Sequence, residues 1–489
     1  MNKKLLTLLA IPFLMTSCTA GSEGNSTSGN DIEGDFLIKE DVTIEFLCLT
    51  DVHYKEDLKK MIKEFKELEP HVSVELTNPP AAGNYNVLEK IVISGFFKED
   101  YPDLVQCYPD NVIKYIDRGY AINLDSYLDH ETYGLKEEKD DYIDTFLKEG
   151  SSYTVKGTYS LPFCKSTELM YYNADVLLGL NLSSVNASIN NGQALDATYL
   201  DNLTWEVLFN DLCPALEAYN ATLDEDHKII DNSDSSAYGI FTYDSDENFF
   251  ITLANQYNYG YTSYDKDNDI GSVDFDNAGM KSLMLMLNQA RSKGYLQTRG
   301  SYNDGYVSDL FKKRQALFTI SSTASLSYNY DENNPFNIGV AKMPHASGKE
   351  YSSINQGPSV CLLDHKNENR SLASYLFWKY ITNEKNSSSW AIDTGYMGIR
   401  NSSYASEEYR NALEPSDAAD SYAKAVADNL RKIAEVRTTT FNTAVFKGSS
   451  NARTYAGQLL TACLKANNLE SDIDELFASY ANQAKEYLD

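Results

Sequence analysis

A strand, an amphipathic helix and a second strand follow one another near the start of the chain, and this run restricts the fold more than any other feature. Val42–Leu49 is apolar and rich in β-branched residues, as buried strands are. Apolar residues at helical spacing then occupy positions 58–68, and Pro70 ends that pattern before the strand-like run Val72–Leu76. Such a βαβ unit pairs its strands in parallel, so the sequence predicts an α/β fold with a parallel sheet.

The rest of the chain repeats this alternation, with more helix in the second half and no internal repeat. The length of 489 residues exceeds what one compact domain usually needs, so we expect two lobes. Short apolar runs predict further strands at Leu104–Cys107, Tyr159–Leu161, Leu169–Tyr172, Ile338–Ala341 and Val360–Leu363. Helical spacing predicts helices at Leu88–Phe97, Asn111–Arg118, Trp205–Ala218, Asn277–Lys293, Leu372–Thr382 and 473–487.

The composition is strongly acidic, with 71 Asp and Glu against 42 Lys and Arg and a formal net charge of -29. Because nucleic acid would be repelled over most of such a surface, we exclude it as a partner. A hydrophobic content of 42% excludes a mostly disordered chain. The 36 tyrosines offer flat apolar faces with polar tips, which suit a wet cleft as well as a core.

The first residues predict export and a lipid anchor. Two lysines precede an apolar run that ends at Leu14 and is too short to span a bilayer, and the following Met-Thr-Ser-Cys resembles a bacterial lipobox. We therefore expect removal of a signal peptide at 1–17, a lipid on Cys18, and a flexible tether over 18–35. The mature protein would sit on the extracytoplasmic face of the cell membrane. An ordinary signal peptide with an incidental cysteine is the alternative.

The remaining cysteines and the histidines predict neither disulfides nor zinc. The six histidines are single and far apart, which disfavours a zinc site. No CxxC pair occurs, and four of the cysteines lie in apolar runs where a buried free thiol is expected. The six cysteines that remain after Cys18 are Cys48, Cys107, Cys164, Cys213, Cys361 and Cys463.

Two segments resemble catalytic or metal-binding motifs only in part. Asp51 and His53 resemble the opening of a metallophosphoesterase site, but the downstream Gly-Asp and Gly-Asn-His are missing after residue 35. Asp265–Asp269 begins like a calcium loop, but Ile270 replaces its turn glycine, so calcium stays an open alternative to an acidic turn. No dinucleotide, P-loop or hydrolase motif occurs. We expect a binding protein that is not an enzyme and needs no cofactor or metal.

Short blocks in a fixed order carry a family resemblance: Glu64–Val74, Tyr101–Val105, Gly119–Leu124, Gly157–Pro162, Leu169–Asn173, Leu203–Glu206, Leu317–Leu326, Gly339–Pro344 and Trp390–Ile399. Together they resemble the extracellular solute-binding proteins of family 1, the maltose and glycerol-3-phosphate type that serves ABC importers. The resemblance implies a two-lobed periplasmic-binding-protein-like fold of type II, whose hinge-connected lobes close on a ligand. It also implies a monomer that delivers a solute to ABC transporter permease subunits.

The class of ligand stays open between two chemistries. Pro162–Thr167, Ser321–Leu326, Asn355–Ser359 and Lys447–Arg453 resemble segments of the glycerol-3-phosphate binders. An arginine with hydroxyls and glycine amides suits a phosphate, but the same groups hold sugar hydroxyls. We favour a mono- or oligosaccharide and keep glycerol-3-phosphate or a glycerophosphodiester as the alternative. A purely adhesive lipoprotein would bind no small ligand.

The resemblance also implies where the lobes and the ligand-binding residues lie. Lobe 1 would comprise 36–162 and 343–388, and lobe 2 would comprise 163–342 and 389–489. Ligands of open α/β sheets bind at the carboxyl ends of strands and in the loops that follow. The residues expected to bind the ligand are Asp51, Tyr54, Tyr108, Asp110, Asn111, Ser166, Trp205, Gly357, Trp390, Tyr396 and Arg453.

Overall fold

The computed structural model describes residues 36–49, 52–79, 85–230, 239–302, 305–415, 417 and 419–488, of which those from Ile38 onward belong to one compact unit. The expected signal peptide, Cys18 and the tether lie outside the described residues, and so does Asp51. Within the described ranges, no helix combines the length and the apolar character that crossing a membrane requires.

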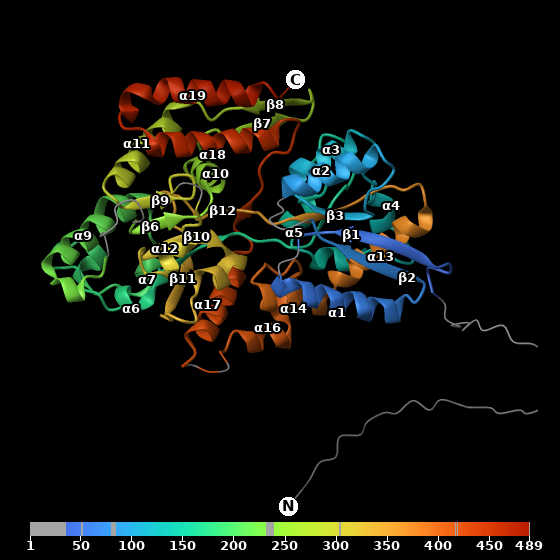
Figure 1. The fold of residues 1–489 in the computed structure, drawn as a ribbon, viewed down its shortest axis with the longest axis horizontal. Coiled ribbons are helices and arrows are strands. Elements are labelled where there is room, and N and C mark those ends of the chain that lie inside the picture. The colour runs from blue at the N-terminus through green and yellow to red at the C-terminus, as the bar shows by residue number, and fades with distance from the viewer. Residues whose placement is uncertain are drawn as a thin grey trace, which may run out of the picture. The chain divides into compact units, whose positions relative to one another are not determined.

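The first sheet has five strands in the order β2-β1-β3-β13-β4 (Figure 1). The predicted βαβ unit is confirmed, because β1 pairs in parallel with β2 and with β3. β13 runs antiparallel to both β3 and β4. The bounds are β1 (Val42–Leu47), α1 (Val52–Leu68), β2 (Val72–Thr77), β3 (Leu104–Cys107), β4 (Leu161–Pro162) and β13 (Ser359–Leu362).

Helices cover this first sheet through aromatic contacts. The ring of Phe377 packs 6.0 Å from Phe46 of β1 and 5.3 Å from Phe65 of α1, measured between centroids. These three rings are buried, so they join α1 and α13 to the sheet and contribute to its hydrophobic core. The helices of this part are α2 (Tyr85–Phe96), α3 (Pro109–Ile116), α4 (Asp125–Leu128), α5 (Asp144–Glu149) and α13 (Glu368–Ile381).

The second sheet also has five strands, in the order β11-β5-β10-β6-β9. β5 runs antiparallel to β10 and β11, whereas β6 is parallel to β10 and β9. Helix α18 packs against α10, α11 and α19 beside this sheet (Figure 1). The bounds are β5 (Glu168–Asn173), β6 (Phe241–Tyr243), β9 (Leu296–Thr298), β10 (Phe318–Ser322), β11 (Ile338–Lys342), α10 (Asp246–Tyr257), α11 (Ala278–Ser292), α18 (Ser449–Lys465) and α19 (Leu469–Lys485).

The helix expected at Trp205–Ala218 is present but irregular. It begins as α8 (Trp205–Val207), widens to a π-helical turn at Leu208–Leu212 and continues as α9 (Cys213–Thr222). Pro214 in the first turn of α9 has no N–H to donate to the preceding turn, which accounts for the break in the regular pattern. Shorter helices elsewhere are α6 (Ala174–Leu177), α7 (Ala197–Leu200), α12 (Ser308–Lys312), α15 (Asn401–Ala405) and α16 (Glu407–Ala412).

Segments that connect the two sheets lie side by side. Ser166, between β4 and β5, exchanges backbone hydrogen bonds of 2.8 and 2.9 Å with Gln356. The neighbouring Lys165 accepts a backbone hydrogen bond of 2.6 Å from the N–H of Met397. Close by, β12 (Ser353–Ile354) pairs with β14 (Thr440–Phe441), which follows α17 (Ser421–Val436). These contacts make one compact group of crossing segments, the kind of connection from which hinges are built.

The expected lobe boundary at 388/389 falls inside a helix. This helix is α14 (Glu384–Thr394), and it packs against α1 and α13 of the first sheet. A boundary inside a regular helix would divide a continuous hydrogen-bonded element, so any division of the chain into moving parts has to fall before or after α14.

The acidic segment Asp265–Asp269 forms the turn of a hairpin between β7 (Thr262–Asp265) and β8 (Ile270–Val273). The carboxylate of Asp265 accepts hydrogen bonds from the backbone N–H groups of Asp267 and Asn268 at 3.0 and 3.3 Å. These bonds explain the turn without an ion. In the part of the chain that the structure describes, no group of three His, Cys, Asp or Glu side chains is placed to hold a metal. The six cysteines after Cys18 are buried and free.

Candidate functional site

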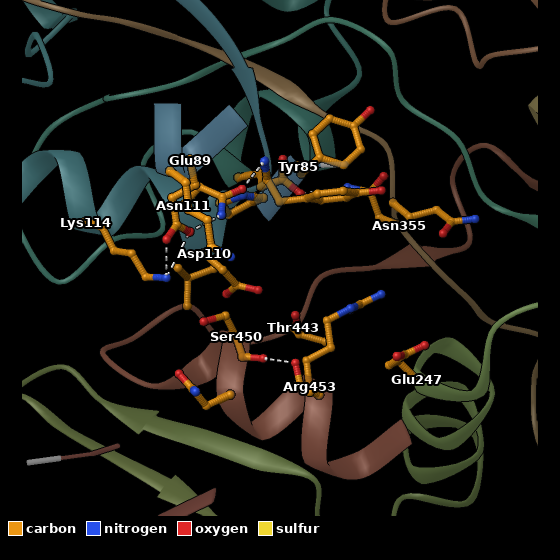
Figure 2. Close-up of a pocket in the computed structure, with 18 residues that line it drawn as sticks. Tyr85, Glu89, Asp110, Asn111, Lys114, Glu247, Asn355, Thr443, Ser450 and Arg453 are labelled. Atoms are coloured by element: carbon orange, nitrogen blue, oxygen red, sulfur yellow. Dashed lines mark hydrogen bonds and ion pairs between the residues drawn. The ribbon is translucent and has the colours of Figure 1, made fainter. Parts of the chain in front are cut away.

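A cavity of about 590 Å³ lies beside the crossing segments, and its size suits a small organic ligand. Figure 2 shows α3 on one side of it and the first turns of α18 on the other. Residues from the first sheet's helices are Tyr85, Glu89, Lys90, Tyr108, Asp110, Asn111 and Lys114. The residues that line the opposite side, from α18 and the segment before it, are Thr443, Val445, Ser450, Asn451, Arg453 and Thr454. The crossing segments contribute Asn355 and Gln356.

The N-terminus of α3 places polar side chains at this cavity directly after β3. Pro109 occupies the first helical position, where its missing N–H and fixed φ suit a helix start. The amide oxygen of Asn111 accepts the backbone N–H of Tyr108 at 3.1 Å, which caps the helix. The Asn111 amide nitrogen donates to Glu89 at 2.6 Å, and Lys114 forms a 2.9 Å ion pair with the same carboxylate. The side chains of this wall are therefore held in place by one another.

Asp110 is the carboxylate of this wall with the fewest partners. Ser449, at the start of α18, donates a hydrogen bond of 2.5 Å to its Oδ1. Burial raises the pKa of Asp110, and the hydrogen bond from Ser449 and the positive charge of Arg453 oppose that rise. Asp110 can thus accept further hydrogen bonds from a ligand, because an ionised carboxylate has about four lone-pair sites.

A second, smaller compartment of about 280 Å³ adjoins the first and shares Tyr108, Gln356 and Arg453 with it. Its acidic groups include Glu168 and Asp244. Burial is the main cause that raises the pKa of Glu168 to about 7 and that of Asp244 to about 6. This compartment therefore holds carboxyl groups that titrate close to neutral pH.

A buried ion pair lies between the cavity and the crossing segments. The Lys165 ammonium donates to Glu149 and also to the carbonyl oxygen of Gly357 at 3.2 Å. Ser359 and Asn355 donate to the two Glu149 oxygens at 3.0 and 3.2 Å. The side chains of Lys165 and Glu149 are 0% and 7% exposed, so each charge depends on the other for its stability. Glu149 also lines the cavity, which links the pair to the ligand space.

Gly357 has a conformational role at this point. Its φ of +86° is one that side chains rarely adopt, and an added Cβ would lie 2.0 Å from the carbonyl oxygen of Cys164. Only glycine lets the two crossing segments approach this closely. Ser166, which pairs with Gln356, is 3% exposed and belongs to the same junction. Ser166 and Gly357, two of the predicted residues, therefore hold the crossing segments together beside the cavity and do not line it.

Four of the predicted residues line the main cavity together: Tyr108, Asp110, Asn111 and Arg453. Tyr54, Trp390 and Tyr396 form a separate aromatic group, with ring centroids 5.9 Å apart for Tyr54 and Trp390 and 6.0 Å apart for Tyr54 and Tyr396. Tyr54 lines a different cavity of about 110 Å³, and Trp390 is only 5% exposed. The structure thus brings the residues after β3 and Arg453 together around the main cavity, and Tyr54, Trp390 and Tyr396 are not among the residues that line it.

Trp205, which the resemblance implies as a ligand-binding residue, lies in the core and does not line the cavity. Its ring is 0% exposed and packs 5.1 Å from Phe249 in the core of the second sheet. Its indole N–H donates to the amide oxygen of Gln256 at 2.7 Å, so its one polar group is satisfied inside the protein. The first turn of α8 therefore packs into the core of the second sheet.

Several lining residues were not predicted from the sequence. Tyr85 packs edge-on against Tyr108 at 4.6 Å, and Glu89 and Lys114 form the ion pair described above. Tyr85 and Glu89 are four positions apart, and so are Asp110 and Lys114; this helical spacing is a signal that could have indicated two polar helix faces. The residues at 443–451 carry no such signal, because their position depends on β14 pairing with β12.

Comparison with known proteins identifies related sequences and folds. The family of bacterial extracellular solute-binding proteins matches residues 60–415. The multiple sugar-binding protein of Streptococcus mutans is 31% identical over 120 residues, which are 24% of this chain and 24% of that protein. The match thus spans only about a quarter of that relative.

Solved structures share the fold at low sequence identity. UgpB of Mycobacterium tuberculosis, in complex with glycerophosphocholine, has a TM-score of 0.66 and 15% identity, covering 92% of this chain and 98% of that one. The maltose/maltodextrin-binding domain MalE of Bdellovibrio bacteriovorus, bound to maltotriose, has a TM-score of 0.62 and 14% identity, covering 91% and 100%. The two-lobed binding-protein fold expected from the sequence is therefore confirmed.

Proposed function

We propose that this chain, which belongs to the bacterial extracellular solute-binding proteins, captures a mono- or oligosaccharide in the cavity between α3 and α18. Members of this family bind solutes and are not enzymes. The observation that carries the proposal is the lining of the cavity, where Asp110, Asn111 and Arg453 border one ligand-sized space (Figure 2).

The chemistry of this lining supports a sugar. A carboxylate accepts hydrogen bonds from neighbouring sugar hydroxyls, an amide both accepts and donates them, and a guanidinium offers several donors in a fixed plane. The tyrosine pair Tyr85 and Tyr108 supplies aromatic surface beside these polar groups, as the CH face of a sugar requires. Closure around the ligand would remove water and strengthen the polar contacts. The sugar-binding name of the Streptococcus mutans relative agrees with this assignment.

A glycerophosphodiester is the second candidate, and Arg453 is the observation that favours it. Within the described residues, the Arg453 guanidinium bonds an amide oxygen and forms no ion pair with a carboxylate, so it could bind a phosphate. The UgpB structure with glycerophosphocholine agrees with this alternative. Against it, Asp110, Glu168 and Glu247 border the same spaces and would repel an anion. We therefore rank the sugar first.

We further propose that the protein acts as a monomer that delivers its ligand to ABC transporter permease subunits from a lipid anchor at Cys18. The extracellular family assignment supports a location outside the cytoplasm. We also propose the division into lobes at 36–162 with 343–388 and 163–342 with 389–489, with the boundary at 388/389 displaced to one end of α14. Labelling cells with a fatty-acid analogue tests the anchor: Cys18→Ser should abolish incorporation, and continued labelling of that variant would contradict it.

A thermal-shift panel tests the ligand class. Mono- and oligosaccharides including maltotriose, glycerol-3-phosphate and glycerophosphocholine are each added to the purified mature protein. A ligand at one hundred times its Kd should stabilise the protein by about 2.7 kcal/mol. Stabilisation by sugars alone supports the first assignment, and stabilisation by phosphorylated ligands alone, lost in Arg453→Ala, supports the second. If no compound raises the melting temperature, the proposal of small-solute capture is wrong.

A further inference from the structure

The amide of Asn248 connects three groups around the two compartments. Asn248 lies in the first turn of α10 and is 3% exposed. Its Nδ2 donates to Glu168 Oε1 at 2.7 Å and to Gln356 Oε1 at 2.6 Å. Its Oδ1 accepts a hydrogen bond from Nη2 of Arg453. Both amide hydrogens and the amide oxygen are therefore used.

The chemistry of the neighbours allows only one orientation of this amide. An ionised Glu168 can only accept hydrogen bonds, and the guanidinium of Arg453 can only donate them. The amide nitrogen must face Glu168, and the amide oxygen must face Arg453. Tyr243 donates to the other oxygen of Glu168, which keeps that carboxylate in position. Gln356 is itself held by its backbone pairing with Ser166.

Arg453 depends on this amide for its position. It borders both compartments, and the bond to Asn248 is its one side-chain hydrogen bond within the part of the chain described here. No ion pair within that part fixes the guanidinium. An arginine side chain has many rotamers, and holding it in one of them before the ligand arrives reduces the entropic cost of binding.

We propose that Asn248, which lines the smaller compartment, is a positioning residue that acts by orienting the Arg453 guanidinium toward the ligand. The predicted effect of Asn248 on ligand affinity rests on the proposed function. Its predicted effect on the motion of the Arg453 side chain does not. The amide has this role because its nitrogen donates to two acceptors, Glu168 and Gln356, whereas its oxygen accepts from the Arg453 cation.

A double-mutant cycle tests the effect on binding, with maltotriose and glycerophosphocholine as probes. Arg453→Met should weaken binding of a responsive probe by about tenfold to a hundredfold. Asn248→Leu should weaken it by a similar factor, and the double variant should lose no more than Arg453→Met alone. If the two losses multiply in the double variant, Asn248 acts independently of Arg453 and the inference is wrong.

A conservative variant tests the role of the amide oxygen separately from that of the amide nitrogen. Asn248→Asp keeps an acceptor for Arg453 but places a second carboxylate against Glu168, with Tyr243, Asp244 and Arg453 as the other titratable or charged neighbours. At pH 6 the two carboxylates can share a proton, so most of the affinity lost in Asn248→Leu should return. The affinity of this variant should fall again toward pH 8, where both carboxylates are ionised. No recovery at pH 6 would contradict the proposed acceptor role.

A measurement without ligand distinguishes failure of this inference from failure of the proposed function. The Nε–Hε NMR signal of Arg453, assigned with Arg453→Lys, should report restricted motion in the ligand-free protein and averaging in Asn248→Leu. Asn220→Leu is the matched control, since Asn220 is also buried and bonds Ile229 and Ile230 in another part of the fold. Unchanged Arg453 motion in Asn248→Leu would overturn the positioning role, whether or not either probe binds.

Discussion

Asp110 and Ser449 are joined across the cavity by a hydrogen bond of 2.5 Å between Oδ1 and Oγ, although 339 residues separate them in the sequence. The contact connects α3, beside the first sheet, to α18, beside the second. This charged hydrogen bond is one of the contacts that join the two walls of the candidate site, and changes at this pair should affect both ligand binding and closure.

Asp110→Asn should weaken ligand binding by about tenfold to a hundredfold, because a hydrogen bond to a charged group is replaced by one to a neutral amide. Isothermal titration calorimetry with a ligand found in the thermal-shift panel measures the loss. Asp117→Asn, at the exposed end of the same helix, is the control and should bind as the unchanged protein does. Equal affinity for Asp110→Asn and the unchanged protein would remove Asp110 from the site.

Trp205→Phe should lower the free energy of unfolding by about 1–3 kcal/mol and leave ligand affinity unchanged. The reason is that Gln256 loses the indole donor at 2.7 Å inside a core where water cannot replace it. Urea denaturation gives the stability change, and calorimetry gives the affinity. A loss of affinity in a variant that stays folded would return Trp205 to the list of ligand contacts.

Lys165→Met should destabilise the protein by about 3–5 kcal/mol, because it leaves the buried carboxylate of Glu149 without its counter-charge. The double variant Lys165→Met/Glu149→Gln should recover part of that loss, since no buried charge remains. Lys148→Met is the control, because Lys148 and Asp144 form an exposed pair whose side chains are 72% and 75% exposed. A double variant less stable than the single one would contradict this account of the pair.

Asp244 should make stability depend on pH in a defined direction. Burial raises its pKa from the usual value near 4 to about 6 in the folded protein. Between these values the unfolded chain has already lost the proton that the folded protein keeps, so stability decreases as the pH rises from 4 to 6. The size of this change is roughly 3 kcal/mol.

Asp244→Asn removes the titrating carboxyl group. Comparing its unfolding free energy with that of the unchanged protein shows how much of the pH dependence comes from Asp244. The unfolding free energy of the variant, measured relative to the unchanged protein by urea denaturation, should increase between pH 4 and pH 7. A difference that stays constant over this interval would show that Asp244 has an ordinary pKa. Loss of the Asp244 charge also lowers the raised pKa of Glu168, and this changes the difference in the same direction.

The first half of the first sheet could be predicted from the sequence because its signals are local. The apolar, β-branched run at Val42–Leu49 and the helical spacing up to Leu68 are signals that do not depend on the rest of the chain. The position of Asp110 follows as well, since polar residues after a strand at the carboxyl edge of a sheet face the ligand space of such folds. The resemblance to solute-binding proteins added Arg453, which no local pattern indicates.

The other wall of the site could not be predicted, because long-range pairing determines it. Thr443 and Asn451 line the cavity only because β14 pairs with β12, nearly ninety positions away. The strands of the second sheet, such as β6 with three residues, are too short to show a clear periodicity. Trp205 was misassigned because an aromatic residue at a helix start has the same sequence pattern in a core as beside a cleft.

The place of α18 in the chain has a consequence for biogenesis. A nascent or partly exported polypeptide that ends before Ser449 contains every strand of both sheets but lacks Arg453 and the wall that faces Asp110. No ligand could stabilise such an intermediate by mass action, since the complete binding surface does not yet exist. Nutrient-dependent stabilisation should therefore act only on the finished, exported molecule, and never on the chain in transit.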